Sequence, residues 1–129
     1  MPTNESIRCR IAACRESLDD GKEWSFYLIN DSGVPLESVV LHSVSHEWGD
    51  VGDSRQVDVR IAKLASGAHA LLWREDGFGG ELRTELSLHV RARGREVSLD
   101  FEFPKLYRQR NLSQVTELGK RGFQVTSVR

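Results

Sequence analysis

The sequence has only two cysteines, no long apolar run and almost no net charge, and each of these shortages excludes a class of protein. No stretch approaches the roughly 18 consecutive apolar residues that a membrane-spanning helix needs, so we expect no membrane partner. Its 18 Lys and Arg residues against 19 Asp and Glu residues leave a net charge of −1, which argues against binding polyanions with the whole surface. The 129 residues, 39% of them hydrophobic and 29% charged, are typical of one globular domain.

The amino-terminal 30 residues also lack a basic segment followed by an apolar stretch, which is the pattern of secretion and import signals, so we expect a cytoplasmic protein. The cysteines, Cys9 and Cys14, are five residues apart, a spacing that matches neither a CxxC redox pair nor a four-ligand zinc knuckle. On one strand they point to opposite faces, so we expect two reduced thiols. A redox or metal role together with a distant residue is the alternative.

Strict alternation of apolar and polar residues is the strongest pattern in the sequence, and this period of two predicts β-strands. It runs through residues 7–13, 36–48, 57–61, 82–90 and 97–103, and an aromatic-rich segment at 24–29 and a short apolar segment at 68–73 bring the predicted strands to seven. Turn-forming residues separate these segments, most clearly at residues 30–35 and 93–96. The period leaves the inward face of the third segment open, and we favour Val39 and Leu41 as its inward-facing residues.

Seven strands without long helical segments between them predict an all-β fold, in which two antiparallel sheets pack face to face as an immunoglobulin-like or fibronectin-like β-sandwich. A closed barrel is the alternative. The Cys and Trp spacing of antibody domains is missing, because both cysteines lie in the first strand, so the predicted architecture implies no function. Trp24, Trp48 and Trp73 lie at strand positions, and we expect them to fill the core or its rim.

The sequence changes character after the predicted sandwich domain of residues 1–104. Residues 105–129 hold six basic residues and one acidic residue, a net charge of +5, so the preceding residues carry about −6. We therefore expect this basic extension to pack on the same domain or on a partner copy.

Within the extension, Asn111 and Gln114 suit the capping of a short helix, and Gly122 is placed to end it. The apolar stripe of that helix would be Leu112, Val115 and Leu118. Residues 123–126 alternate once more, which predicts an additional strand at a sheet edge, with docking elsewhere as the alternative.

Candidate metal ligands are few and weak. His42 and His46 are four residues apart and share one face of a strand, but two ligands do not make a zinc site. Asp50 and Asp53 could offer oxygen ligands to a hard cation, although their loop lacks the pattern of an EF-hand. We therefore expect no metal and no cofactor.

Motifs of catalysis and of nucleic-acid binding are also missing. The sequence contains no GxSxG, GxxxxGK[ST] or GxGxxG pattern, so we expect a protein that is not an enzyme. The RNP, KH and zinc-finger signatures are absent and most of the chain is acidic, so we do not expect nucleic acid as a partner.

The remaining interpretation is a non-enzymatic β-sandwich interaction module that binds a protein partner or, as a homodimer, itself. Its candidate contact residues are Phe78, in a glycine-rich loop, and Tyr107, Arg108, Arg110 and Phe123, in the basic extension. The alternative is a small-ligand or metal-binding domain that uses His42, His46 and the loop with Asp50 and Asp53.

Overall fold

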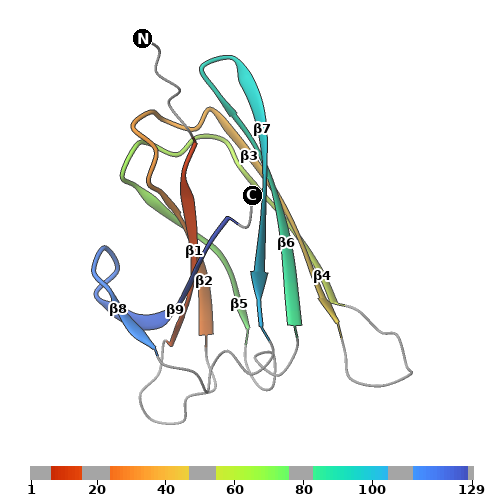
Figure 1. The fold of residues 1–129 in the computed structure, drawn as a ribbon, viewed down its shortest axis with the longest axis vertical. Coiled ribbons are helices and arrows are strands. Elements are labelled where there is room, and N and C mark those ends of the chain that lie inside the picture. Colours follow the sequence, from red (N-terminus) through yellow and green to blue (C-terminus); the bar gives the residue numbers. More distant parts are fainter. Residues whose placement is uncertain (1–6, 16–23, 47–54, 76–82, 105–111, 128–129) are drawn as a thin grey trace.

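A computed structural model describes residues 7–15, 24–46, 55–75, 83–104 and 112–127, and these residues form nine β-strands and no helix (Figure 1). In chain order the strands are β1 (Cys9–Arg15), β2 (Trp24–Asn30), β3 (Ser38–His46), β4 (Arg55–Ile61), β5 (His69–Glu75), β6 (Arg83–Ala92), β7 (Arg95–Phe103), β8 (Ser113–Val115) and β9 (Lys120–Thr126). Each of the seven predicted segments corresponds to one of the strands β1 to β7. Local sequence patterns, mainly alternation, therefore predicted these strands correctly.

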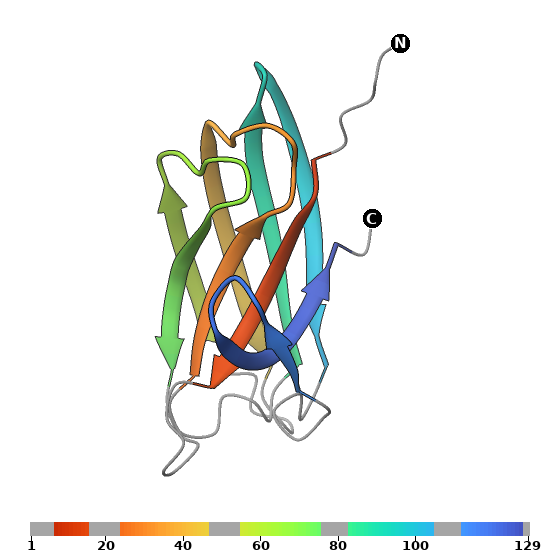
Figure 2. The same ribbon diagram turned by 90° about the vertical axis from the view of Figure 1, so that its left-hand side faces the viewer.

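The nine strands form two antiparallel sheets, as the sequence predicted. The five-stranded sheet has the order β5-β2-β1-β9-β8, and the four-stranded sheet has the order β4-β3-β6-β7. In Figure 2 the five-stranded sheet lies in front of the four-stranded sheet. The chain passes from one sheet to the other after β2, β4, β5 and β7, so strands that are adjacent in a sheet are often distant in sequence.

One hydrophobic core contains side chains from the inner faces of both sheets. Val39 and Leu41 of β3 are 1% and 0% exposed, which confirms the predicted inward face of this strand. Phe26 of β2 stacks on Trp73 of β5, with ring centroids 4.2 Å apart, and meets Phe103 of β7 edge to face at 5.3 Å. Burial of a Phe side chain stabilises the folded state by about 1.5–3 kcal/mol, so the packing of these three rings contributes substantially to the association of the two sheets.

The cysteines and two of the three tryptophans lie where the sequence placed them. Cys9 faces the main core and Cys14 the opposite face of β1, and neither forms a disulfide. Burial raises the pKa of the Cys9 thiol to about 12, so this cysteine stays protonated. Trp24 is buried and Trp73 is half-buried against the core, whereas Trp48 lies outside the described residues.

The predicted C-terminal helix is wrong, because residues 113–126 form the β8–β9 hairpin. The residues of the supposed apolar stripe pack on two different sides of the five-stranded sheet. Leu112 packs against the main core, whereas Val115 and Leu118 pack on the opposite face. A helix would place all three on one stripe, so these tertiary contacts outweigh the local helical pattern. Gly119, with a φ of 64°, provides the left-handed residue of the hairpin turn.

Gly122 is a point of close approach between strands and not the end of a helix. A Cβ atom at this position would lie 2.5 Å from the carbonyl oxygen of Ala13 on β1, so glycine permits β9 to pair with β1. The predicted strand at residues 123–126 exists as the second half of β9. Residues 123–126 pair with β1 on one side, and β8 pairs only with residues 120–122, so residues 123–126 lie at the edge of the described sheet, as predicted.

Candidate functional site

The β8–β9 hairpin covers part of the outer face of the five-stranded sheet (Figure 2). Beneath it lies a second apolar cluster, formed by Ala12, Cys14, Tyr27, Ile29 and Val115. Lys120 Nζ donates a hydrogen bond to the Tyr27 hydroxyl at 3.0 Å. Arg10 donates to both carboxylate oxygens of Asp31, at 2.6 and 2.9 Å, and to the carboxylate of Glu117 in the hairpin turn. The hydrogen bond from Arg10 holds the pKa of Glu117 below its ordinary value. This face is therefore partly occupied by the chain itself.

The outer face of the four-stranded sheet is different, because all of its side chains in the described part of the chain are exposed or half-exposed. These side chains come from alternate positions of four strands whose other positions face the core. We call this surface the outer polar face, and its residues are Ser38, Val40, His42 and Val44 of β3, Asp58 and Arg60 of β4, Glu85, Ser87, His89 and Arg91 of β6, and Glu96, Ser98, Asp100 and Glu102 of β7. Only the two valines are aliphatic, so the face is polar and charged.

Both histidines of the outer polar face are held by residues of a neighbouring strand. His42 Nδ1 lies 2.5 Å from Asp58 Oδ1, and because a carboxylate only accepts, the imidazole N–H is the donor. His89 Nδ1 lies 2.9 Å from Ser98 Oγ. Each pair joins residues that are directly opposite in the strand register. The two imidazoles therefore have fixed positions on the surface.

A shallow hollow of about 490 Å³ opens at one end of this face. It lies over β3, β6 and β7, close to the turn between β6 and β7. Three valines, Val40, Val90 and Val97, contribute to its lining, together with the polar residues Ser38, His89, Arg91, Glu96 and Ser98. The hollow is open to solvent and combines hydroxyl, imidazole, guanidinium and carboxylate groups.

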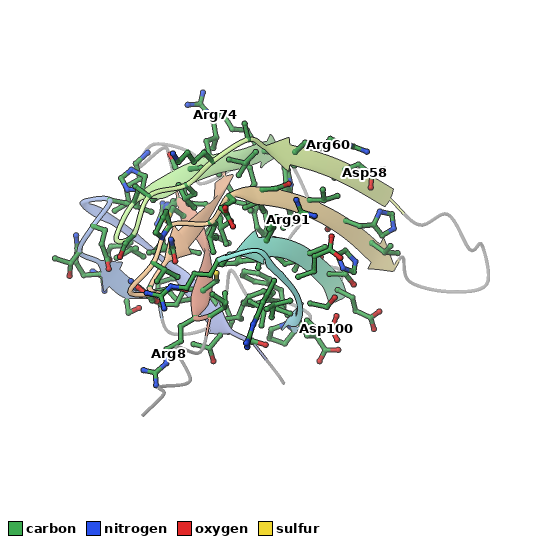
Figure 3. The ribbon with its side chains drawn as sticks, turned by 90° about the horizontal axis from the view of Figure 1, so that it is seen from above. Arg8, Asp58, Arg60, Arg74, Arg91 and Asp100 are labelled. Atoms are coloured by element: carbon green, nitrogen blue, oxygen red, sulfur yellow. The ribbon has the colours of Figure 1, made fainter. Side chains whose placement is uncertain are left out.

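Both described arginines of the outer polar face lie at one end, and four of its five described carboxylates lie in the other half. Arg60 and Arg91 lie at the end with the hollow, where Arg91 Nη2 is 3.7 Å from the exposed carboxylate of Glu96. The other half of the face carries four carboxylates, those of Asp58, Glu85, Asp100 and Glu102. Figure 3 shows Asp58 and Arg60 close together on one edge strand and Asp100 toward the other edge of the sheet. The face is therefore a surface dipole.

The candidate metal residues do not form a metal site in the described part of the chain. His42 is hydrogen-bonded to Asp58, and His46 is the last residue of β3, with a side chain that lies outside the described part. Asp50 and Asp53 also lie outside the described residues. Among the described residues, no group of three His, Cys, Asp or Glu side chains could hold a metal ion.

Of the predicted contact residues, the structure describes only Phe123. Its ring is half-buried and packs against the core, with its centroid 5.9 Å from that of Phe103. The others, Phe78, Tyr107, Arg108 and Arg110, lie outside the described residues. The predicted grouping of these contact residues therefore stays a prediction.

The residues of the outer polar face were visible in the sequence only as the polar half of each alternation. Asp58 and Arg60, or Glu85 and Arg91, carry opposite charges on one strand, and that signal is readable. The order β4-β3-β6-β7, however, brings these strands together and cannot be read from the alternation.

Comparison with known proteins gives no match: no protein family, no curated protein and no solved structure is significantly similar to this chain. No helix in the described ranges is long and apolar enough to cross a membrane.

Proposed function

We propose that the protein is a non-enzymatic β-sandwich of the immunoglobulin-like or fibronectin-like class that binds protein through its outer polar face. The two antiparallel sheets, their common core and the repeated crossing of the chain between sheets support this class of fold. We also propose a cytoplasmic location, which the two free thiols support.

The observation that carries this function is the separation of charge on an exposed, well-supported sheet face. Its side chains project from all four strands of the sheet, the interior strands β3 and β6 and the edge strands β4 and β7. The opposite side of each of these strands packs in the core. A protein partner can present charges of both signs to such a dipole, and complementary charges give orientation and specificity. A nucleic acid offers only negative charge, which the four carboxylates of the face repel.

The surroundings of His42 support a binding role over catalysis. Its imidazole pairs with Asp58, as in many general bases, but its side chain is 43% exposed on a nearly flat sheet. General bases gain strength in sites that exclude water and position a substrate, and an open sheet face provides neither.

A photo-crosslinking experiment tests this function. A photoreactive amino acid replaces Ser98, which lines the hollow, and in a control variant it replaces Lys63, an exposed residue between β4 and β5. In cells that produce the protein, we expect a discrete crosslinked protein from position 98 and none from position 63. Equal products from both positions, or none from position 98, would refute the proposal.

The second candidate is a small-ligand or metal-binding domain that uses His42, His46 and the loop with Asp50 and Asp53. The observation in favour of a small ligand is the hollow, whose hydroxyl, imidazole and guanidinium groups belong to Ser38, Ser98, His89 and Arg91 and not to His42 or His46. Metal analysis of the purified protein decides it, because a stoichiometric metal that is lost in His42→Ala would support this candidate. A metal-free protein would refute its metal-binding form.

A further inference from the structure

The outer polar face has a centre that the strand register defines. Val59, Leu41, Leu88 and Leu99 are successive partners across β4, β3, β6 and β7, and all four pack in the main core. We call these four residues the midpoint row. Because side chains alternate along each strand, the outward-facing residues lie at matched distances on either side of this row.

The main charges reverse their sign across the midpoint row. On β4, Arg60 and Asp58 lie one residue to either side of Val59. On β6, Arg91 and Glu85 lie three residues to either side of Leu88. Both arginines lie on the side of the β6–β7 turn and both carboxylates on the other side. On β4 and β6 the charge pattern is therefore complementary to its own reversed image, whereas β7 carries carboxylates on both sides of the row.

We infer that the partner of the outer polar face is a second copy of this chain, stacked face to face about a two-fold axis that crosses the strands at the midpoint row. This inference rests on the proposed function, since it names the protein that the face binds. Such an axis places each strand on the reversed strand of the second copy. Arg60 then meets Asp58 of the second copy, and Arg91 meets Glu85 of the second copy. A two-fold interface is isologous, so each of these ion pairs occurs twice.

The same charges disfavour the other face-to-face arrangement. A two-fold axis parallel to the strands would lay β4 on β7 and would keep the ends of the face in register. Asp58 would then meet Asp100 of the second copy, because both lie in the row that contains His42 and Ser87. Opposed like charges suppress the wrong orientation, so the charge pattern selects the axis that crosses the strands.

The size of the face predicts a weak, salt-sensitive dimer. Four strands spaced about 4.8 Å apart and about nine residues long cover roughly 19 by 30 Å, or about 570 Å² for each copy. A total of about 1,100 Å² lies at the low end for specific interfaces, where complexes are transient. Ion pairs at an exposed face are weakened by salt, so the dimer should be strongest at low ionic strength.

One feature of the face opposes the dimer and gives a further test. Glu96 and Glu102 lie three residues to either side of Leu99 on the edge strand β7, so the stacking brings Glu96 against Glu102 of the second copy. This contact of like charges lies at the rim, where solvent screens it. Glu102→Gln removes the repulsion and should strengthen the dimer.

Sedimentation equilibrium of the full chain, from about 1 to 300 µM at low and high salt, tests the inference. We expect a monomer–dimer equilibrium that Glu85→Arg and Arg91→Glu each weaken at least about tenfold, because each places like charges in contact twice. The double variant, which carries both changes, should recover most of the affinity. Lys63→Glu, an exposed charge reversal outside the face, is the matched control and should change nothing. Far-UV circular dichroism and thermal melting verify that each variant is folded, and Arg60→Asp with Asp58→Arg provides a second pair.

The outcomes separate this inference from the proposed function. A chain that stays monomeric at 300 µM and low salt refutes the inference, and a dimer that both single reversals leave unchanged refutes it as well. If position 98 still crosslinks to a different protein, the proposed function stands without the second copy. If the chain is monomeric and position 98 gives no crosslinked protein, both fail. Dimerisation that the single reversals weaken and the double variant restores supports both.

Discussion

Asn30, at the end of β2, offers the sharpest test of how the fold is held together. Its side chain is fully buried and connects two loops at one end of the five-stranded sheet. The amide Nδ2 donates to the carbonyl oxygens of Val34 at 3.0 Å and of Leu64 and Ala65 at 3.2 Å each, and Oδ1 accepts from the N–H of Ser32 at 2.9 Å. Because Nδ2 has two hydrogens, one of them is shared between two carbonyl groups.

Asn30→Ala removes about three net hydrogen bonds and leaves buried backbone groups without a partner. At about 1 kcal/mol for each bond, the free energy of unfolding should fall by about 3–4 kcal/mol. Asn30→Asp should be worse at pH 7, because a carboxylate has no hydrogen to donate and would face three carbonyl oxygens.

The pH dependence of the two Asn30 variants distinguishes lost contacts from carboxylate repulsion. Burial against carbonyl groups raises the pKa of an aspartate at this position above its unfolded value, so its destabilisation grows as the pH rises above about 4. Urea denaturation should therefore show that Asn30→Asp recovers part of its stability between pH 7 and pH 4, whereas Asn30→Ala keeps a constant deficit.

The matched control for Asn30 is Ser66→Ala, which removes a single hydrogen bond from Ser66 Oγ to the carbonyl oxygen of Ser32, at 2.6 Å. It should cost about 1 kcal/mol. A loss below about 1 kcal/mol in Asn30→Ala would contradict the reasoning, since four contacts would then be worth no more than one. So would equal stability of Asn30→Asp and Asn30→Ala at pH 7.

Three further predictions concern the five-stranded sheet. Gly122→Ala should lower the free energy of unfolding by about 1–3 kcal/mol, because its Cβ would lie 2.5 Å from a carbonyl oxygen of β1, whereas Gly33→Ala meets nothing within 4 Å and should be nearly neutral by thermal melting. Both buried cysteines should resist a thiol reagent in the native protein at pH 8 and react only after unfolding, since the pKa of Cys9 is about 12; rapid labelling without urea would contradict the buried placement. Because Arg10 lowers the pKa of Glu117, the carboxylate contributes stability above its unfolded pKa and loses it as the pH falls. The deficit of Glu117→Gln in urea denaturation should therefore be present at pH 7 and shrink below the ordinary value of 4.5, and a deficit that is constant with pH would argue against the ion pair.

The strands β1 to β7 could be predicted from the sequence because the signal for a strand is local. In β6 and β7 the apolar residues occupy every second position on both sides of a two-residue turn, Arg93 and Gly94, both of which have positive φ values. In β3 the alternation left two possible inward faces, and the burial of Val39 and Leu41 decides between them. Successive side chains of a strand point to opposite faces of the sheet, so a short segment of sequence is enough to predict which residues share a face.

The hairpin β8–β9 and Asn30 could not be predicted in this way, because distant residues decide their roles. Residues 112–118 have the spacing of a helix, and only the pairing of β9 with β1 turns them into a hairpin. Asn30 begins a run of turn-forming residues, and its local pattern predicts an exposed turn. Its burial depends on carbonyl groups 34 and 35 residues further along the chain.

The candidate site shows the same limit in its electrostatics. The near-zero charge of the chain suggested a basic extension attracted to an acidic body, yet within the described residues the ion pair between them has the opposite polarity. Glu117, the one acidic residue of the extension, pairs with Arg10 of the body, and backbone pairing with apolar contacts supplies most of the attachment.

On the four-stranded sheet, by contrast, the separated charges have no apolar contact to support an association. A rise in salt from 50 to 500 mM, which shortens the screening length from roughly 14 to 4 Å, should therefore dissociate the proposed dimer and leave the melting temperature of the monomer nearly unchanged. If salt lowered the melting temperature of the monomer as it dissociated the dimer, the same charges would stabilise both the fold and the interface. The distinction between the covered outer face of the five-stranded sheet and the open outer face of the four-stranded sheet would then be wrong.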